Sequence, residues 1–162
     1  GISVPLSIIF NKSMSEGVVP SQFKLAEIKP IFKGGSKFVY NNYRPVSLLP
    51  CISKILEKII HFRLYRYLES NNILYDKQYG FREKRGTIDA IINILGHIIN
   101  DNETNLYSAA LLIDLSKAIE SIDLNILLYK LETCGIRGLP FNWFKSYLTD
   151  RSQSVKINNE NG

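Results

Sequence analysis

After Pro50 the chain carries the pattern that most restricts its fold. From Ile52 to Leu68, apolar residues recur at every third or fourth position, which predicts one long amphipathic helix ending near Asn71 and Asn72. The opposite face of this helix carries four basic residues, which are Lys54, Lys58, Arg63 and Arg66. Hydrophobic residues make up 45% of the chain and charged residues 22%, so a disordered or collagen-like chain is excluded.

Weaker patterns predict four more helices. The first has Ser3 as its cap and Gly17 beyond its end, and the next begins at Thr87, with Thr87 as its cap and its isoleucine and leucine side chains inside. The last two cover residues 124–133 and the stretch that opens at Pro140.

Strands are predicted around the pair Gly34-Gly35. Residues 25–33 alternate loosely, and residues 39–46 are a plausible partner strand across the Gly-Gly turn. Pro30 and Pro45 indicate sheet edges or breaks. A short buried strand is predicted at residues 107–113 and a closing strand at residues 152–158. The order of elements predicts an α+β fold in which helices separate the strands.

The net charge of +5 is concentrated in the first half of the chain. Between Lys24 and Arg85 there are thirteen Lys and Arg against five Asp and Glu, a net charge of +8, whereas the remainder has a net charge of −3. A basic half joined to a mildly acidic half suggests a surface for a polyanion beside a carboxylate site. A set of solvated helix and loop faces explains the same composition equally well.

Several classes of protein do not fit the sequence. No run approaches the ~18 apolar residues that span a bilayer, and the N-terminus lacks both an initiator Met and the order of a signal peptide. We therefore expect an intracellular piece of a longer protein that does not contact membranes. Cys51 and Cys134 lack metal-ligand spacing and are expected to be buried thiols.

Asp114 is the most informative acid, because it ends the apolar run that is predicted to be a buried strand. A carboxylate held at a strand end can ligate Mg²⁺, although a cap or turn role is the more common use of such a residue. Two-metal phosphoryl chemistry needs at least two carboxylates, so Asp114 alone is an incomplete site. Glu120 and Asp123 follow closely, but either of them could equally start the next helix.

Basic residues near the Gly-Gly turn are candidates for phosphate binding. Arg44, together with Lys33 or Lys37, could neutralise a triphosphate, and the alternative is an exposed turn with solubilising charges. Farther along, residues 78–82 combine Gln78, Gly80, Phe81 and Arg82 with a tyrosine, in a block that could stack on a nucleic-acid strand and contact its phosphates. A plain glycine turn with anchoring aromatic residues is the other reading of this block.

Taken together, these motifs resemble the reverse transcriptase of non-LTR retrotransposons of the LINE-like, jockey type. Four ordered blocks carry the resemblance, and a fifth fits it. They are residues 23–35, residues 42–49 with 52–57, residues 78–82 with Thr87, residues 112–118 and residues 147–153.

The resemblance implies part of a right-hand polymerase fold. Residues 1–105 are expected to form the fingers and residues 106–162 the first part of the palm. In such enzymes the aspartate that matches Asp114 binds the catalytic Mg²⁺ (or Mn²⁺) ions, and the backbone after it, here at Leu115, holds the incoming dNTP. The partners implied are an RNA template, a DNA primer and dNTPs, in the cytoplasm and nucleus, and the oligomeric state stays open.

The resemblance also implies roles for individual residues in nucleotide and template binding. Arg44 matches a triphosphate ligand of the fingers, Lys33 and Lys37 match more weakly, and the block from Gln78 to Arg82 is similar to a segment near the template strand. Ile119, followed by Glu120, stands where the family usually has an aromatic residue followed by Asp. That aromatic position commonly excludes ribonucleotides, and branched Ile119 could still block a 2′-hydroxyl group.

The family continues with a Pro-Gln-Gly segment and a hairpin bearing two adjacent aspartates, neither of which occurs in the 162 residues. We therefore expect this polypeptide alone to be inactive in nucleotidyl transfer, and the strand before Asp114 to expose apolar side chains. The alternative function is a remnant that binds RNA or an RNA–DNA hybrid without catalysis, through the basic surface between Lys24 and Arg85.

Overall fold

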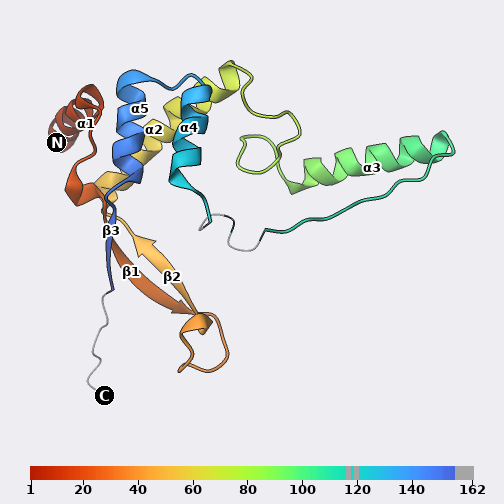
Figure 1. Ribbon diagram of the computed structural model, residues 1–162, viewed down its shortest axis with the longest axis horizontal. Coiled ribbons are helices and arrows are strands. Elements are labelled where there is room, and N and C mark those ends of the chain that lie inside the picture. Colours follow the sequence, from red (N-terminus) through yellow and green to blue (C-terminus); the bar gives the residue numbers. More distant parts are fainter. Residues whose placement is uncertain (116–117, 119–120, 156–162) are drawn as a thin grey trace. The chain divides into compact units, whose positions relative to one another are not determined.

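A computed structural model describes residues 1–115, 118 and 121–155 of the chain (Figure 1). The helices are α1 (Ser3–Glu16), α2 (Cys51–Ser70), α3 (Thr87–Glu103), α4 (Leu124–Thr133) and α5 (Gly138–Leu148), and the strands are β1 (Leu25–Phe32), β2 (Tyr43–Leu48) and β3 (Ser152–Val155). Short 3₁₀ turns lie at Ser21–Phe23 and Tyr40–Asn42. The predicted mixture of helices and strands is confirmed, and no described helix is long and apolar enough to cross a membrane.

The chain divides into two compact units, and the division falls inside α2. One unit comprises Gly1–Leu64 and Asp123–Gly162, and the other comprises Tyr65–Ile122. The first contains every described strand together with α1, α4, α5 and most of α2. The second contains the end of α2, a loop and α3.

The core of the first unit lies where α1, α2 and α5 meet. Phe10, Val19, Leu56 and Trp143 are buried there, and Leu56 is only 2% exposed. The Trp143 ring stacks on the Tyr147 ring, with centroids 5.3 Å apart, and its Nε1–H donates to the Ser13 hydroxyl at 3.0 Å. The predicted helix is confirmed, and its apolar stripe is buried in part: Leu56 lies in this core and Ile52, Ile59 and Ile60 pack against it, whereas Ile55 and Tyr67 are exposed.

A three-stranded sheet with the order β2-β1-β3 extends from this core. β1 pairs antiparallel with β2 and parallel with β3, so the predicted hairpin is confirmed and the predicted closing strand joins it at Ser152–Val155. The remainder of the predicted closing strand, residues 156–158, lies outside the described residues.

The predicted caps of α1 and α3 are corrected by the structure, and Asp123 is found at the start of α4. Ile2, not Ser3, is the residue before α1, and Gly86, not Thr87, is the cap of α3. The Asp89 carboxylate accepts the Gly86 N–H at 2.7 Å and so satisfies one donor at the start of α3. Asp123 does start α4, because its carboxylate accepts the N–H groups of the second and third helical residues, at 2.7 and 3.2 Å.

The strand predicted at residues 107–113 is wrong. Residues 106–115 form neither helix nor strand, and Leu111, Leu112 and Ile113 are 86%, 92% and 76% exposed. A strand needs a neighbour to hydrogen-bond, and the three described strands all lie in the other unit and pair among themselves. The expected exposure of apolar side chains in this segment is confirmed.

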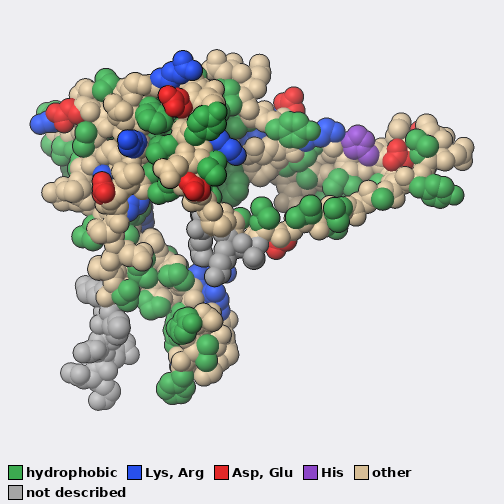
Figure 2. Space-filling view, viewed as in Figure 1, with side chains coloured by type: hydrophobic (Ala, Val, Ile, Leu, Met, Phe, Trp, Pro, Cys, Tyr) green, Lys and Arg blue, Asp and Glu red, His purple; other side chains and the backbone are tan. Residues whose placement is uncertain are grey.

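The prediction that the apolar side chains of α3 lie inside is also wrong. Ile88, Ile92 and Ile99 are all more than half exposed, and no described residue of α3 is buried. Figure 2 shows hydrophobic side chains along α3 and the segment that follows it. The expectation of buried thiols fails too, because Cys51 is exposed and Cys134 is half-buried.

Candidate functional site

The hairpin of β1 and β2 brings Lys33 and Arg44 onto one face. Side chains alternate along a strand, and the register pairs Ile31 with Arg44, so Lys29 and Ile31 share the face on which Arg44 lies. Lys33 follows the end of β1, and its N–H bond to the Asn42 carbonyl continues the pairing, which places Lys33 on the same face. Arg44 is diagonal to both lysines, a position about 7–8 Å away in an antiparallel pair. We call Lys29, Ile31, Lys33, Arg44 and Val46 the basic face of the hairpin.

The other side of the hairpin is apolar. Pro30, Phe32, Tyr43 and Pro45 alternate with the residues of the basic face, and we call them the aromatic face. The Phe32 and Tyr43 rings pack with their centroids 5.4 Å apart. The two faces therefore separate the charges of the hairpin from its aromatic and proline side chains.

The loop of residues 33–42 closes the hairpin with a defined geometry. The Lys33 N–H donates to the Asn42 carbonyl at 2.8 Å, and the Asn42 side-chain amide donates to the Ser36 carbonyl at 2.9 Å. Gly34 and Gly35 have φ values of 128° and 88°, and a Cβ on Gly35 would lie 2.8 Å from Asn42 Nδ2. The Gly-Gly pair is therefore required by the turn that positions Lys33.

Lys37 is held differently from Lys33. It lies in the loop, where its carbonyl accepts the Tyr43 hydroxyl at 3.0 Å. Because Lys37 lies outside the paired residues, the register does not group it with Arg44, whereas the bond of Lys33 to Asn42 continues the pairing. Lys29 was missed by the reasoning from sequence, and only the pairing of β1 with β2 reveals that it shares the face of Arg44.

The cations of the basic face have no acidic partner among the described residues. The ion pairs of those residues involve Lys12, Arg82 and Arg85, and none involves Lys29, Lys33 or Arg44. All three side chains belong to exposed residues. Like charges close together on a strand pair destabilise it, so this arrangement favours an anionic ligand.

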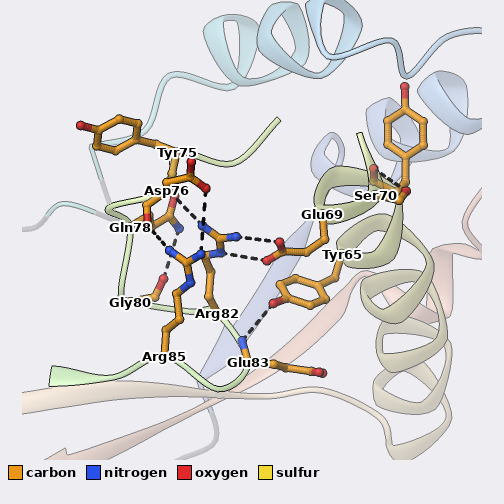
Figure 3. Close-up of polar contacts among 11 residues, drawn as sticks. Tyr65, Glu69, Ser70, Tyr75, Asp76, Gln78, Gly80, Arg82, Glu83 and Arg85 are labelled. Carbon is orange, nitrogen blue, oxygen red and sulfur yellow. Dashed lines mark hydrogen bonds and ion pairs between the residues drawn. The ribbon is translucent and has the colours of Figure 1, made fainter. Parts of the chain in front are cut away.

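Arg82 is fixed inside the second unit by Glu69 (Figure 3). Its Nε and Nη2 atoms donate to the two carboxylate oxygens of Glu69 at 2.8 and 2.6 Å, and Nη1 donates to the Tyr75 carbonyl at 2.9 Å. The Arg82 side chain is 6% exposed. The hydrogen bonds from Arg82 are the main cause that lowers the pKa of Glu69, and a hydrogen bond with Tyr65 is the second cause. In turn, Glu69 raises the pKa of Arg82.

Two further hydrogen bonds hold the 78–82 block and the residue that follows it. The Gln78 side-chain amide donates to the Gly80 carbonyl at 3.2 Å, and the Tyr65 hydroxyl accepts the Glu83 N–H at 3.0 Å (Figure 3). Phe81 is 96% exposed and has a φ of 59°, which is uncommon for a residue with a side chain. The block is thus a loop anchored by Arg82, with the Phe81 ring in solvent.

Asp114 and Leu115 lie in the exposed segment of the second unit, whereas Arg44 and Lys33 lie in the first. Ile119 and Glu120 lie outside the described residues. Among the residues that the structure does describe, no group of three or more His, Cys, Asp or Glu side chains could hold a metal ion. The Asp114 carboxylate therefore supplies one suitable oxygen ligand for Mg²⁺ but not a complete site.

Comparisons with known proteins cover nearly the whole chain. The family model described as reverse transcriptase (RNA-dependent DNA polymerase) matches residues 31–162. The chain is 31% identical over 155 residues to the probable RNA-directed DNA polymerase from transposon BS of Drosophila melanogaster, an alignment that covers 95% of this chain and 17% of that protein.

A second relative is the RNA-directed DNA polymerase from mobile element jockey of Drosophila melanogaster. It is 29% identical over 153 residues, which are 94% of this chain and 17% of the relative. The chain thus spans about a sixth of the length of these relatives, 17% in both alignments. The family match begins within β1 and includes Arg44, the 78–82 block and Asp114. The chain belongs to the reverse transcriptase (RNA-dependent DNA polymerase) family.

Proposed function

We propose that this chain is the fingers and the first part of the palm of an RNA-directed DNA polymerase from a non-LTR retrotransposon. The family match over residues 31–162 carries this proposal, and the relatives named for transposon BS and jockey support the type of element. The substrates proposed are an RNA template, a DNA primer and dNTPs.

Within that function, the basic face receives the triphosphate of the incoming nucleotide. Arg44 presents a planar guanidinium that can bind two phosphate oxygens at once, and Lys33 adds a positive charge from the residue that follows the neighbouring strand. The Gly34-Gly35 turn fixes where Lys33 lies relative to Arg44. The geometry supports Lys37 less well, because it lies in the loop and outside the register that groups the other cations with Arg44.

The 78–82 loop is proposed to contact the template strand. Its residues have different contacts and are therefore given different roles. Arg82 is occupied by Glu69 and the Tyr75 carbonyl, so it positions the loop. Exposed Phe81 offers its ring for stacking on a base. Gln78 and Gly80 hold the turn between them.

Asp114 is proposed as a ligand of the divalent metal ion that polymerases of this family use. When bound, such an ion neutralises charge on the transferring phosphoryl group. The remaining ligands would come from outside the described residues, because these contain no complete metal site. Leu115 and Ile119 are proposed to flank the nucleotide, as the resemblance implies.

The test is RNA-templated primer extension by the complete reading frame that contains residues 1–162, with and without Asp114→Asn. We expect the substitution to abolish extension while RNA binding is kept, because a neutral amide replaces the anionic metal ligand. Asp123→Asn is the matched control, because Asp123 caps α4 and is not proposed to bind a metal ion. Undiminished extension by Asp114→Asn would refute the proposed role.

A further inference from the structure

Lys29 extends the basic face beyond what a single triphosphate needs. It is four residues before Lys33, which directly follows the end of β1, a distance of about 13 Å at ~3.3 Å per residue. Arg44 lies between the two lysines, opposite Ile31. Lys33 and Arg44 suffice for one phosphate cluster at the loop end, and Lys29 then adds a third cation on the other side of Arg44.

Lys29 is exposed and is held in place by strand pairing. It stands in the central strand of the sheet and pairs with Val46 of β2, and its own side chain belongs to an exposed residue with no acidic partner among those described. Glu27, the next residue on this face toward the core, is half-buried. A cation fixed by strand pairing at the edge of a phosphate site favours a ligand that has a second phosphate at a fixed spacing.

Ile31 distinguishes this surface from a simple cluster of charges. It is 52% exposed and lies between Lys29 and Lys33 on the same face. A run of cation, apolar side chain and cation matches a polynucleotide strand, in which phosphates alternate with sugars and bases.

We propose that Lys29 binds a backbone phosphate of a single-stranded nucleic acid that passes along the basic face, next to the triphosphate held by Lys33 and Arg44. This inference rests on the proposed function, since it assumes that Lys33 and Arg44 hold the triphosphate. Lys29 acts as a positioning residue: it aligns the strand with the nucleotide and takes no part in bond making.

The experiment measures two ligands on the 162-residue protein. Fluorescence anisotropy with labelled single-stranded oligo(U) gives the RNA affinity at several salt concentrations, and calorimetry gives the affinity for inorganic tripolyphosphate. The variants are Lys29→Gln, Lys29→Arg, Lys33→Gln and Arg44→Gln. Lys12→Gln is the matched control, since it removes the same charge from exposed α1, where Lys12 pairs with Glu16.

For Lys29→Gln we expect RNA binding to weaken about three- to tenfold near 0.1 M salt and the slope of log K against log salt to fall by about 0.7, the value for one phosphate contact on a single strand. Tripolyphosphate binding is expected to stay unchanged, and Lys29→Arg is expected to restore RNA binding. Lys33→Gln and Arg44→Gln are expected to weaken tripolyphosphate binding.

Other outcomes would overturn the inference in distinguishable ways. If Lys29→Gln behaves like Lys12→Gln toward RNA, or if the wild-type protein does not bind RNA, Lys29 has no such role, even where Lys33 and Arg44 still bind tripolyphosphate. If Lys29→Gln weakens tripolyphosphate binding as much as Arg44→Gln does, Lys29 belongs to the triphosphate site. If tripolyphosphate binding survives both Lys33→Gln and Arg44→Gln, the proposed triphosphate site itself fails.

Discussion

Pro30 and Pro45 lie directly opposite each other in the antiparallel pair of β1 and β2. Residues in such a pair alternate between hydrogen-bonded and non-hydrogen-bonded positions. The Lys33 N–H bonds the Asn42 carbonyl, so the pair three positions along, Pro30 with Pro45, is of the non-hydrogen-bonded kind. Neither proline therefore removes a hydrogen bond between these two strands.

Moving a proline by one residue should break this arrangement. Val46 pairs with Lys29 at a hydrogen-bonded position, so Val46→Pro removes a donor and leaves the Lys29 carbonyl without its partner. We expect a loss of about 1–3 kcal/mol in the free energy of unfolding. Urea unfolding measures it, and Pro45→Val is the control that should stay within about 1 kcal/mol of the wild type. Equal losses in both variants would contradict the register.

The loop glycine Gly35 should be irreplaceable for ligand binding. Gly35→Ala forces a side chain onto a backbone with a φ of 88° and places its Cβ 2.8 Å from Asn42 Nδ2. We expect weaker tripolyphosphate binding, because the displaced loop no longer positions Lys33. Gly96→Ala is the control: nothing lies within 4 Å of its Cβ, and alanine in the middle of α3 should raise helicity. Unchanged binding by Gly35→Ala would show that the loop does not set the site.

Ser13 and Ser15 provide a matched test of the core. The Ser13 hydroxyl accepts the Trp143 Nε1–H at 3.0 Å and donates to the Val18 carbonyl at 2.7 Å, whereas the Ser15 hydroxyl bonds an exposed carbonyl of its own helix. Ser13→Ala should cost about 1–3 kcal/mol of unfolding free energy, since it leaves a buried indole donor unpaired. Ser15→Ala should change it by less than about 0.5 kcal/mol. Similar values for both would argue against the Trp143 bond.

The ion pair of Glu69 and Arg82 should order the 78–82 loop in a pH-dependent way. The pKa of Glu69 is lowered in the folded protein, so its contribution to stability is present above the ordinary glutamate pKa and is lost as the pH falls through the lowered value. Glu69→Gln should speed amide hydrogen exchange in the loop at neutral pH and make less difference in acid. Glu83→Gln is the control, because Glu83 contributes its backbone N–H to the Tyr65 bond. Slow exchange retained in Glu69→Gln would contradict the anchor.

Tyr147 should make the first unit sensitive to alkali. Burial, with a further contribution from the bond to Glu57 at 2.8 Å, raises the pKa of Tyr147 to about 12. The Tyr147 hydroxyl loses its proton near pH 10 in the unfolded chain and near pH 12 in the folded chain. The free energy of unfolding therefore falls as the pH rises from 10 to 12. The half-exposed ring limits the loss to about 1–2 kcal/mol after solvent screening. Urea unfolding at pH 9 and pH 11 should show a larger drop for the wild type than for Tyr147→Phe. Equal drops would contradict the raised pKa.

Features set by local sequence could be predicted, and features set by distant partners could not. The spacing of apolar residues from Ile52 to Leu68 predicts α2, and Gly34-Gly35 predicts the hairpin, because both depend on near neighbours. The strand expected before Asp114 fails, because a strand depends on a partner that no nearby residue supplies.

The same division holds for the candidate site. Arg44 and Lys33 could be chosen from residue type and their nearness to a turn, and the register places them on one face. Lys29 was missed because only that register groups it with them. The bond between Arg82 and Glu69, thirteen residues apart, was missed because nothing in either residue's local sequence indicates the other.

The two faces of the hairpin have a consequence for deletions within β1. Deletion of one codon inside β1 keeps the reading frame but shifts every following side chain of that strand to the opposite side of the sheet. Lys33 would then stand with the prolines and rings of the aromatic face, away from Arg44. A single in-frame deletion between Ile28 and Phe32 should therefore separate Lys33 from Arg44 and weaken tripolyphosphate binding.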